Sequence, residues 1–158
     1  TAVSGLDAKD VIDIQVTVDS LATADELAEA LLTAGYPRVE RITADVPKPD
    51  GRSTVAAFDH TDDNQLWHKR FHASADPGRP TNIHLRVAGW PNQQFALLFT
   101  DWLIANPGVR ADYLAAKRNA AAAHSDVGGY AEAKEPWFLD GYRRAWAWAD
   151  STGWTPGP

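Results

Sequence analysis

The sequence lacks cysteine and methionine, and no stretch of it is apolar over about 18 residues. Without cysteine the chain forms no disulfides and performs no thiolate chemistry, which fits a reducing cytoplasm. Without a long apolar run or a signal-peptide pattern, we expect a cytoplasmic location and no membrane partner. The absence of methionine even at position 1 leads us to expect a piece of a longer chain.

The composition predicts one globular domain with its own core. The chain has 158 residues, of which 44% are hydrophobic, and this is enough apolar material for a core. Its 21 acidic and 15 basic residues give a formal net charge of −6, so no nucleic-acid partner is expected. A local basic patch remains compatible with this balance.

Residues 11–18 alternate strictly between two kinds of side chain. Ile12, Ile14, Val16 and Val18 share one side, and Val11, Asp13, Gln15 and Thr17 share the other. A period of two over eight residues is typical of a strand with one buried and one wetter face. Asp13 is therefore predicted on an open sheet face.

A predicted hairpin follows in the middle of the chain. Residues 66–74 alternate, residues 81–88 alternate again, and the short loop between them makes the pair antiparallel. Shorter strands are expected at 39–42 and 55–58. These strands form the sheet-forming half of the expected domain, residues 1–89.

The first predicted helix has a start and a stop signal. Thr23 and Glu26 form a capping-box pattern, in which the hydroxyl accepts from an amide of the first turn and the carboxylate reaches back. Gly35 suits a left-handed helix stop. The favoured interpretation is a structural one, in which this helix packs on the core.

From position 90 onward the spacing becomes helical. Helices are expected over about 90–105, 109–124 and 130–148, with Pro136 or Gly141 as the expected point of interruption in the last. We therefore expect a helical half at 90–150 and a loosely held tail at 151–158.

If the three alternating strands share one sheet with helices over its apolar side, the other side collects polar residues. They are Asp13, Gln15, Thr17, His68, Arg70, His72, Asn82, His84 and Arg86. Such a cationic face on an acidic protein suits an anionic ligand, for example a nucleotide phosphate. The alternative is the ordinary solvent-facing side of a one-sided sheet.

Two tyrosine–lysine pairs offer further phosphate contacts. Tyr113 with Lys117, and Tyr130 with Lys134, each place a phenol and an ammonium one helical turn apart. Aimed at the sheet they would close a cleft around phosphates and a base or sugar. The alternative is lysine stems that lie over tryptophan rings. Lys9 stands beside the start of the first strand.

Several blocks resemble the GrpB-like family. Thr1-Ala-Val-Ser-Gly-Leu, Ala8-Lys9 and Ile12-Asp13-Ile14 resemble its signature; Asn82-Ile-His84-Leu-Arg-Val87 is similar to its His-Leu-His-Val strand; Leu98-Phe-Thr-Asp101-Trp-Leu, Tyr113-Leu-Ala-Ala-Lys117 and Tyr130-Ala-Glu-Ala-Lys134 resemble later blocks. The resemblance covers nearly the whole chain. It implies an α+β fold, with a nucleotidyltransferase-like mixed or antiparallel sheet, helices on one face and a C-terminal helical region. A Gly-Ser pair precedes Thr-Ala-Val in the family, so we expect a truncated N-terminus.

Residues 69–80 are similar to a narrower group, the GrpB-like C-terminal domain of actinobacterial bifunctional dephospho-CoA kinases. The resemblance implies a partner, an N-terminal P-loop kinase domain of the parent chain. No Gly-x-x-x-x-Gly-Lys-Ser/Thr pattern occurs in these 158 residues. This chain alone is therefore not expected to phosphorylate dephospho-CoA, and an accessory role in coenzyme A biosynthesis is implied.

The resemblance to nucleotidyltransferases also implies strand carboxylates that hold Mg²⁺. Asp13 matches the first carboxylate, Gln15 stands at the second, and His84 stands where a third is expected. Glutamine brings no charge and imidazole suits Mg²⁺ poorly, so we expect weak or absent two-metal chemistry. A one-metal or metal-free reaction, with His84 as general base and Lys117 or Lys134 on phosphate, stays open.

Three hypotheses follow. The first is a nucleotide- or phosphate-binding module with degenerate catalytic residues, the second an active metal-dependent nucleotidyltransferase, and the third a structural or folding partner of the kinase domain without a ligand. Under the first, the predicted binding residues are Lys9, Arg70, His72, Arg86, Tyr113, Lys117, Tyr130 and Lys134.

Overall fold

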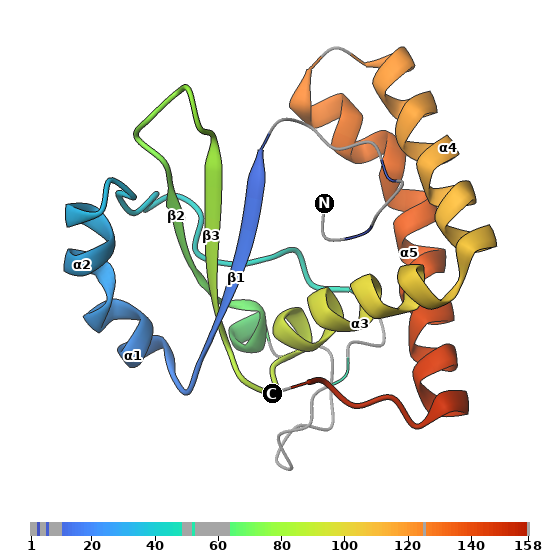
Figure 1. Cartoon of the computed structure of the whole chain (residues 1–158), viewed down its shortest axis with the longest axis horizontal. Coiled ribbons are helices and arrows are strands. Elements are labelled where there is room, and N and C mark those ends of the chain that lie inside the picture. Colours follow the sequence, from blue (N-terminus) through green and yellow to red (C-terminus); the bar gives the residue numbers. More distant parts are fainter. Residues whose placement is uncertain are drawn as a thin grey trace. The chain divides into compact units, whose positions relative to one another are not determined.

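The computed structural model describes Val3, Leu6, residues 11–48, Arg52, residues 64–124 and residues 126–157 (Figure 1). The chain divides into two compact units, the first mainly residues 8–94 and the second residues 95–158 with residues 2–7. Lys9 and the strand expected at 55–58 lie outside the described residues.

The first unit is built on a mixed three-stranded sheet. Its strands are β1 (Ile12–Val18), β2 (Arg70–Ala73) and β3 (Thr81–Val87), in the order β1-β3-β2. β1 runs parallel to β3, and β2 runs antiparallel to it. The predicted hairpin is confirmed, with a first strand shorter than expected because Asn64–Trp67 forms a 3-10 helix, η1.

The core of the first unit lies on one face of this sheet. Ile83, Leu85 and Val87 of β3 are buried there, together with Val18 and Ala24. The short helices α1 (Leu21–Glu26) and α2 (Ala28–Thr33) lie on that side (Figure 1). Burying each of the larger aliphatic side chains contributes about 2 kcal/mol to folding. The helices thus leave the opposite face of the strands to polar side chains.

The predicted capping box of the first helix is wrong. The Ser20 hydroxyl is the N-cap and accepts from the Thr23 amide at 3.1 Å, so the helix begins one turn earlier than the pattern at Thr23 indicates. Leu27 then separates α1 from α2. The predicted stop at Gly35 is confirmed, with a φ of 91° that favours glycine.

The strand expected at 39–42 is instead a tight turn, closed by a hydrogen bond from the Ile42 amide to the Val39 carbonyl at 3.0 Å. Single bridges on either side of the turn join Arg38 to His72 and Ala44 to His68. This segment therefore runs beside β2 without becoming a regular strand. We call residues 43–48 the Asp45 loop.

Three helices complete the chain: α3 (Pro91–Ala105), α4 (Pro107–Ala123) and α5 (Val127–Thr152). The first turn of α3 belongs to the first unit. Prolines stand in the first turns of α3 and α4, where the missing amide costs nothing. None of the described helices combines the length and the apolarity that crossing a membrane requires.

The interruption expected in the last helix is wrong, because α5 continues through Pro136 and Gly141. Proline removes one helical hydrogen bond, and aromatic packing within the second unit stabilises the helix around it. The Trp137 ring lies 4.6 Å from the Tyr113 ring, which in turn meets Phe99 edge-on at 5.2 Å.

Candidate functional site

The register of β1 and β3 places polar side chains opposite one another. Asp13 faces Asn82, Gln15 faces His84, and Thr17 faces Arg86. Alternation within each strand puts all six on the side away from the core, as the sequence predicts for β1 and β3. This face is the start of the candidate site.

Strand β2 does not contribute to this face the residues that the alternation in the sequence predicted. Phe71 pairs with His84 and shares its face, whereas Arg70 and His72 pair with core residues on the opposite face. The prediction that His68, Arg70 and His72 join this face is therefore wrong. Alternation separates two sets of side chains but does not say which set faces the core.

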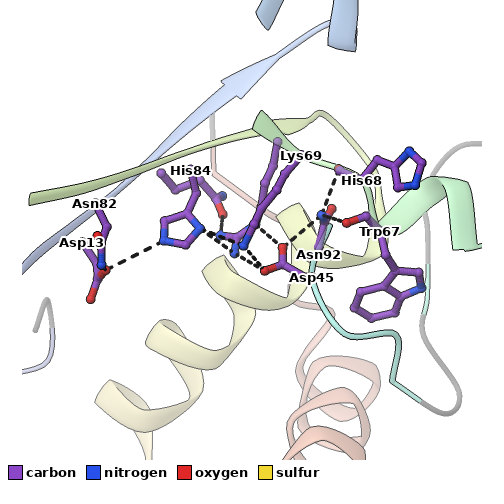
Figure 2. A network of polar contacts seen from close by, with 10 residues as sticks. Asp13, Asp45, Trp67, His68, Lys69, Asn82, His84 and Asn92 are labelled. Atoms are coloured by element: carbon purple, nitrogen blue, oxygen red, sulfur yellow. Dashed lines mark hydrogen bonds and ion pairs between the residues drawn. The ribbon is translucent and has the colours of Figure 1, made fainter. Parts of the chain in front are cut away.

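The displaced residues have structural partners elsewhere. The Arg70 guanidinium donates to Asp25 of α1 at 2.6 and 2.8 Å. His72 is fully buried, with Nδ1 2.9 Å from the Tyr36 carbonyl oxygen. The His68 side chain points away from His84 and Asp45 (Figure 2).

At the centre of the polar face lies a partly buried acid, Asp45, which the sequence analysis did not single out. Its Oδ2 accepts from Arg86 Nε at 2.9 Å and from Asn92 Nδ2 at 3.2 Å, and its Oδ1 accepts from a second guanidinium nitrogen at 3.2 Å. Lys69 Nζ forms an ion pair with Oδ1. We call Asp45, Lys69, Arg86 and Asn92 the Asp45 cluster.

His84 links this cluster to Asp13 (Figure 2). Its Nδ1 lies 3.2 Å from Lys69 Nζ and 3.3 Å from an Arg86 nitrogen. Both neighbours are donors, so Nδ1 accepts and the ring proton belongs on Nε2. Nε2 lies 3.8 Å from Asp13 Oδ1, and this oxygen accepts a hydrogen bond from Asn82 Nδ2 at 2.9 Å.

The charges shift the pKa values of this network. Burial raises the pKa of Asp45, but hydrogen bonds and charge from Arg86 and Lys69 outweigh it, so the pKa lies below its ordinary value. Burial lowers the pKa of Lys69 more than Asp45 raises it. Burial and the two cations likewise lower the pKa of His84, against the opposing contact with Asp13. His84 is therefore neutral at pH 7.

Asp13 and Gln15 do not fit a Mg²⁺ site. Gln15 Oε1 accepts from an Arg86 nitrogen at 2.7 Å, so a cation already occupies the amide oxygen. Asp13 brings the one remaining carboxylate, and its contacts with His84 and Asn82 lower its pKa. Within the described ranges, no three histidine, aspartate or glutamate side chains gather to hold a metal.

The two tyrosine–lysine pairs belong to the second unit. Lys117 Nζ lies 5.7 Å from the centre of the Tyr113 ring, and Lys134 Nζ lies 4.1 Å from that of Tyr130. Burial raises the pKa of Tyr113 to about 12. Each pair is thus a cation–π contact between its own lysine and tyrosine, whereas the alternative in the sequence analysis placed the lysine stems over tryptophans.

Two members of the Asp45 cluster carried signals that the sequence analysis did not use, and a third carried none. Lys69 alternates in step with Phe71, and Asn92 begins a run of three carboxamides in the first turn of an otherwise apolar helix. All three carboxamides are buried. Asp45 stands in an irregular loop before Pro47, and periodicity says nothing about such a position.

Comparison with known proteins places the chain among relatives of two kinds. A dephospho-CoA kinase of Mycolicibacterium paratuberculosis is 71% identical over 150 residues, which cover 94% of this chain and 37% of that protein. A dephospho-CoA kinase of Mycobacterium bovis is 68% identical over 160 residues, which cover 99% of this chain and 39% of that protein. The chain thus spans less than two fifths of the length of these relatives.

The other relatives carry the name GrpB. The glutamate-rich protein GrpB of Alkalihalophilus pseudofirmus is 30% identical over 142 residues, which cover 89% of this chain and 71% of that protein. The crystal structure of the conserved protein GrpB from Enterococcus faecalis matches 91% of this chain and 74% of its own, with a TM-score of 0.62 at 20% identity. The fold is therefore that of a solved GrpB protein, consistent with the expected nucleotidyltransferase-like α+β class. The family described as GrpB protein matches residues 1–144, and the chain belongs to this family.

Proposed function

We propose that this chain is a phosphate- or nucleotide-binding accessory module that works beside a dephospho-CoA kinase and has lost catalytic function of its own. One observation carries the proposal: Lys69 and Arg86, both largely buried, direct their donors at a single oxyanion position on the polar sheet face. Two desolvated cations that converge on one point form the kind of donor set that binds phosphate groups.

The residues around this position argue against nucleotidyl transfer. A general base needs a free nitrogen lone pair, but His84 Nδ1 faces two cationic donors and Nε2 carries the proton. The amide oxygen of Gln15 faces Arg86 rather than open space. We therefore propose binding that does not require Mg²⁺ and is not followed by turnover.

The metabolic setting of the proposal comes from the relatives. Proteins named dephospho-CoA kinase contain a stretch that is 68–71% identical to this chain and makes up 37–39% of their length. We propose that the kinase portion of such a protein is the partner and that the ligand is a nucleotide or coenzyme A, both of which carry phosphates. A cytoplasmic location is part of this proposal.

The test is calorimetric titration of ATP, CTP, GTP and coenzyme A into the protein, with Mg²⁺ and with EDTA. We expect saturable binding of at least one ligand, with equal affinity under both conditions. Arg86→Gln should weaken that binding at least about tenfold, because it removes a charge-assisted contact worth about 1.5–3 kcal/mol.

The matched control is Arg70→Gln, which changes an arginine of the same sheet on the opposite face. Its affinity should equal that of the unmodified protein, and circular dichroism should establish that both variants are folded. Absence of binding by every ligand, or equal loss in the two variants, would reject the proposed function. Pyrophosphate release that depends on Mg²⁺ would favour the nucleotidyltransferase hypothesis instead.

A further inference from the structure

We propose that the Asp45 carboxylate occupies the place of a ligand phosphate, so that the Asp45 loop is an internal plug which a bound phosphate displaces. The inference rests on the proposed function and defines its site more closely. It makes the described conformation a closed, self-occupied form of an oxyanion site.

The first argument is the donor set around Asp45. Its two oxygens accept from two guanidinium nitrogens, one amide nitrogen and one ammonium, which come from Arg86, Asn92 and Lys69. An ionised carboxylate is a pure acceptor, as a phosphate is, and the planar fork of arginine binds either anion through two nitrogens. A phosphate oxygen pair in place of Oδ1 and Oδ2 would meet the same donors.

The second argument is that Arg86 and Asn92 lie on regular secondary structure, whereas the acceptor lies on a loop. Arg86 belongs to the central strand, and Asn92 lies in the first turn of α3, where its amide also donates to the carbonyls of Trp67 and His68. Asp45 arrives on an irregular loop, next to a Val46 that is 71% exposed. The Asp45 amide and the Thr43 carbonyl form the nearest backbone bonds between this loop and residues 67–69.

The third argument is charge. Lys69 and Arg86 contribute two positive charges and Asp45 one negative charge, which leaves one positive charge within the Asp45 cluster. A phosphate dianion in place of the carboxylate would balance both cations. Since interactions between desolvated charges are much stronger than those in water, this balance favours the exchange.

The first test compares two variants that remove the same charge on opposite faces. Asp45→Asn opens the proposed site, whereas Asp25→Asn removes the partner of Arg70 and Arg38. Equilibrium binding of inorganic phosphate is measured for both variants and for the unmodified protein at pH 7.5. We expect Asp45→Asn to bind phosphate at least about tenfold more tightly than the unmodified protein, which corresponds to about 1.4 kcal/mol, and Asp25→Asn to match the unmodified protein. Equal affinities in all three, or equal gains in both variants, would overturn the plug.

A second test needs no variant and stands even if Asp45→Asn does not fold. Amide hydrogen exchange of the unmodified protein is followed with saturating phosphate and with chloride at equal ionic strength. Displacement of the loop should release the bonds from the Asp45 amide to Trp67 and from the Lys69 amide to Thr43, so both amides should exchange faster with phosphate. Unchanged or slower exchange of these two amides would overturn the inference.

The outcomes separate this inference from the proposed function. Nucleotide binding by the unmodified protein without a gain in Asp45→Asn leaves the function standing and removes the plug. A gain in phosphate affinity without binding of any nucleotide or coenzyme A by the unmodified protein supports the plug and rejects the function.

Discussion

The two faces of the sheet each carry an aspartate clamped by basic residues, and the two clusters differ in burial. On the core side of β2, Asp25 pairs with Arg70 at 2.6 Å and with Arg38 at 2.7 Å, and its side chain is 43% exposed. On the polar face the Asp45 side chain is 23% exposed, and its partners Lys69 and Arg86 are 6% and 12% exposed.

The difference shows in the pKa values. For Asp25 the hydrogen bond from Arg70 is the largest influence, and together with the charges of Arg70 and Arg38 it outweighs burial and lowers the pKa to about 2. For Asp45, burial is the largest single influence and opposes its cations. The short ion-pair distances alone therefore do not show which of the two clusters is more costly to disrupt. When an exposed ion pair is broken, water replaces the lost partner. When the partner of a buried charge is removed, no water is there to replace it.

We expect the largest effect on the free energy of unfolding when Arg86 is removed, and a much smaller effect when Arg70 is removed. Arg86→Ala leaves Asp45 with one cation fewer in a buried setting and should lower the free energy of unfolding by about 3–5 kcal/mol. Arg70→Ala should cost about 1 kcal/mol or less. Urea unfolding of both variants measures the difference, and equal losses would contradict the comparison.

A smaller effect concerns pH and His84. The folded-state pKa of His84 lies below its ordinary value of 6.5, so below pH 6.5 the unfolded chain binds a proton that the folded chain resists. Stability should therefore fall as the pH drops from 7 through the folded pKa, where Lys69 and Arg86 repel the new charge and Asp13 and Asp45 offset part of it.

The variant His84→Gln removes this titration. We expect a smaller drop in melting temperature between pH 7 and pH 5 than in the unmodified protein. His68→Gln is the matched control, since the His68 side chain points away from His84 and Asp45. An unchanged slope in His84→Gln would show that folding does not shift the pKa of His84, and a larger drop would show that folding raises it.

The smallest effect is expected for Asp25→Asn, at about 0.5 kcal/mol at pH 7 and low salt. The contribution of Asp25 is complete above pH 3.8 and is lost as the pH falls toward about 2. Salt should screen this exposed cluster and leave the Asp45 cluster nearly unchanged. Melting curves at about 0.05 M and 1 M NaCl test this, and equal salt dependence in Asp25→Asn and the unmodified protein would contradict it.

Local patterns predicted most of the strands and helices, and the β1 and β3 residues of the polar face, but not its remaining members. Period-two alternation was sufficient for β1, the hairpin and the shared face of Asp13 and His84. It could not assign the two sides of β2, because the side that faces the core depends on contacts with α1 and α2. That is why Arg70 was expected where Lys69 lies.

Asp45 could not be predicted for a different reason. It owes its place to a segment that pairs with β2 through single bridges at Arg38 and Ala44, and no repeat in the sequence marks such pairing. Its partners come from β3, from α3 and from the stretch before β2. A site assembled from four separate segments leaves no local spacing to recognise.

The parallel pairing of β1 with β3 has a consequence for how the protein acquires this face. Each residue of β1 pairs with one 69 positions later, as Ile12 does with Thr81, whereas the hairpin partners β2 and β3 are joined by a short loop. Contacts between distant positions cost more loop entropy and form later. We therefore expect Lys69, His84 and Arg86 to come together early in folding and Asp13 and Gln15 to dock last. Completion of the polar face would then report that the whole first unit has folded.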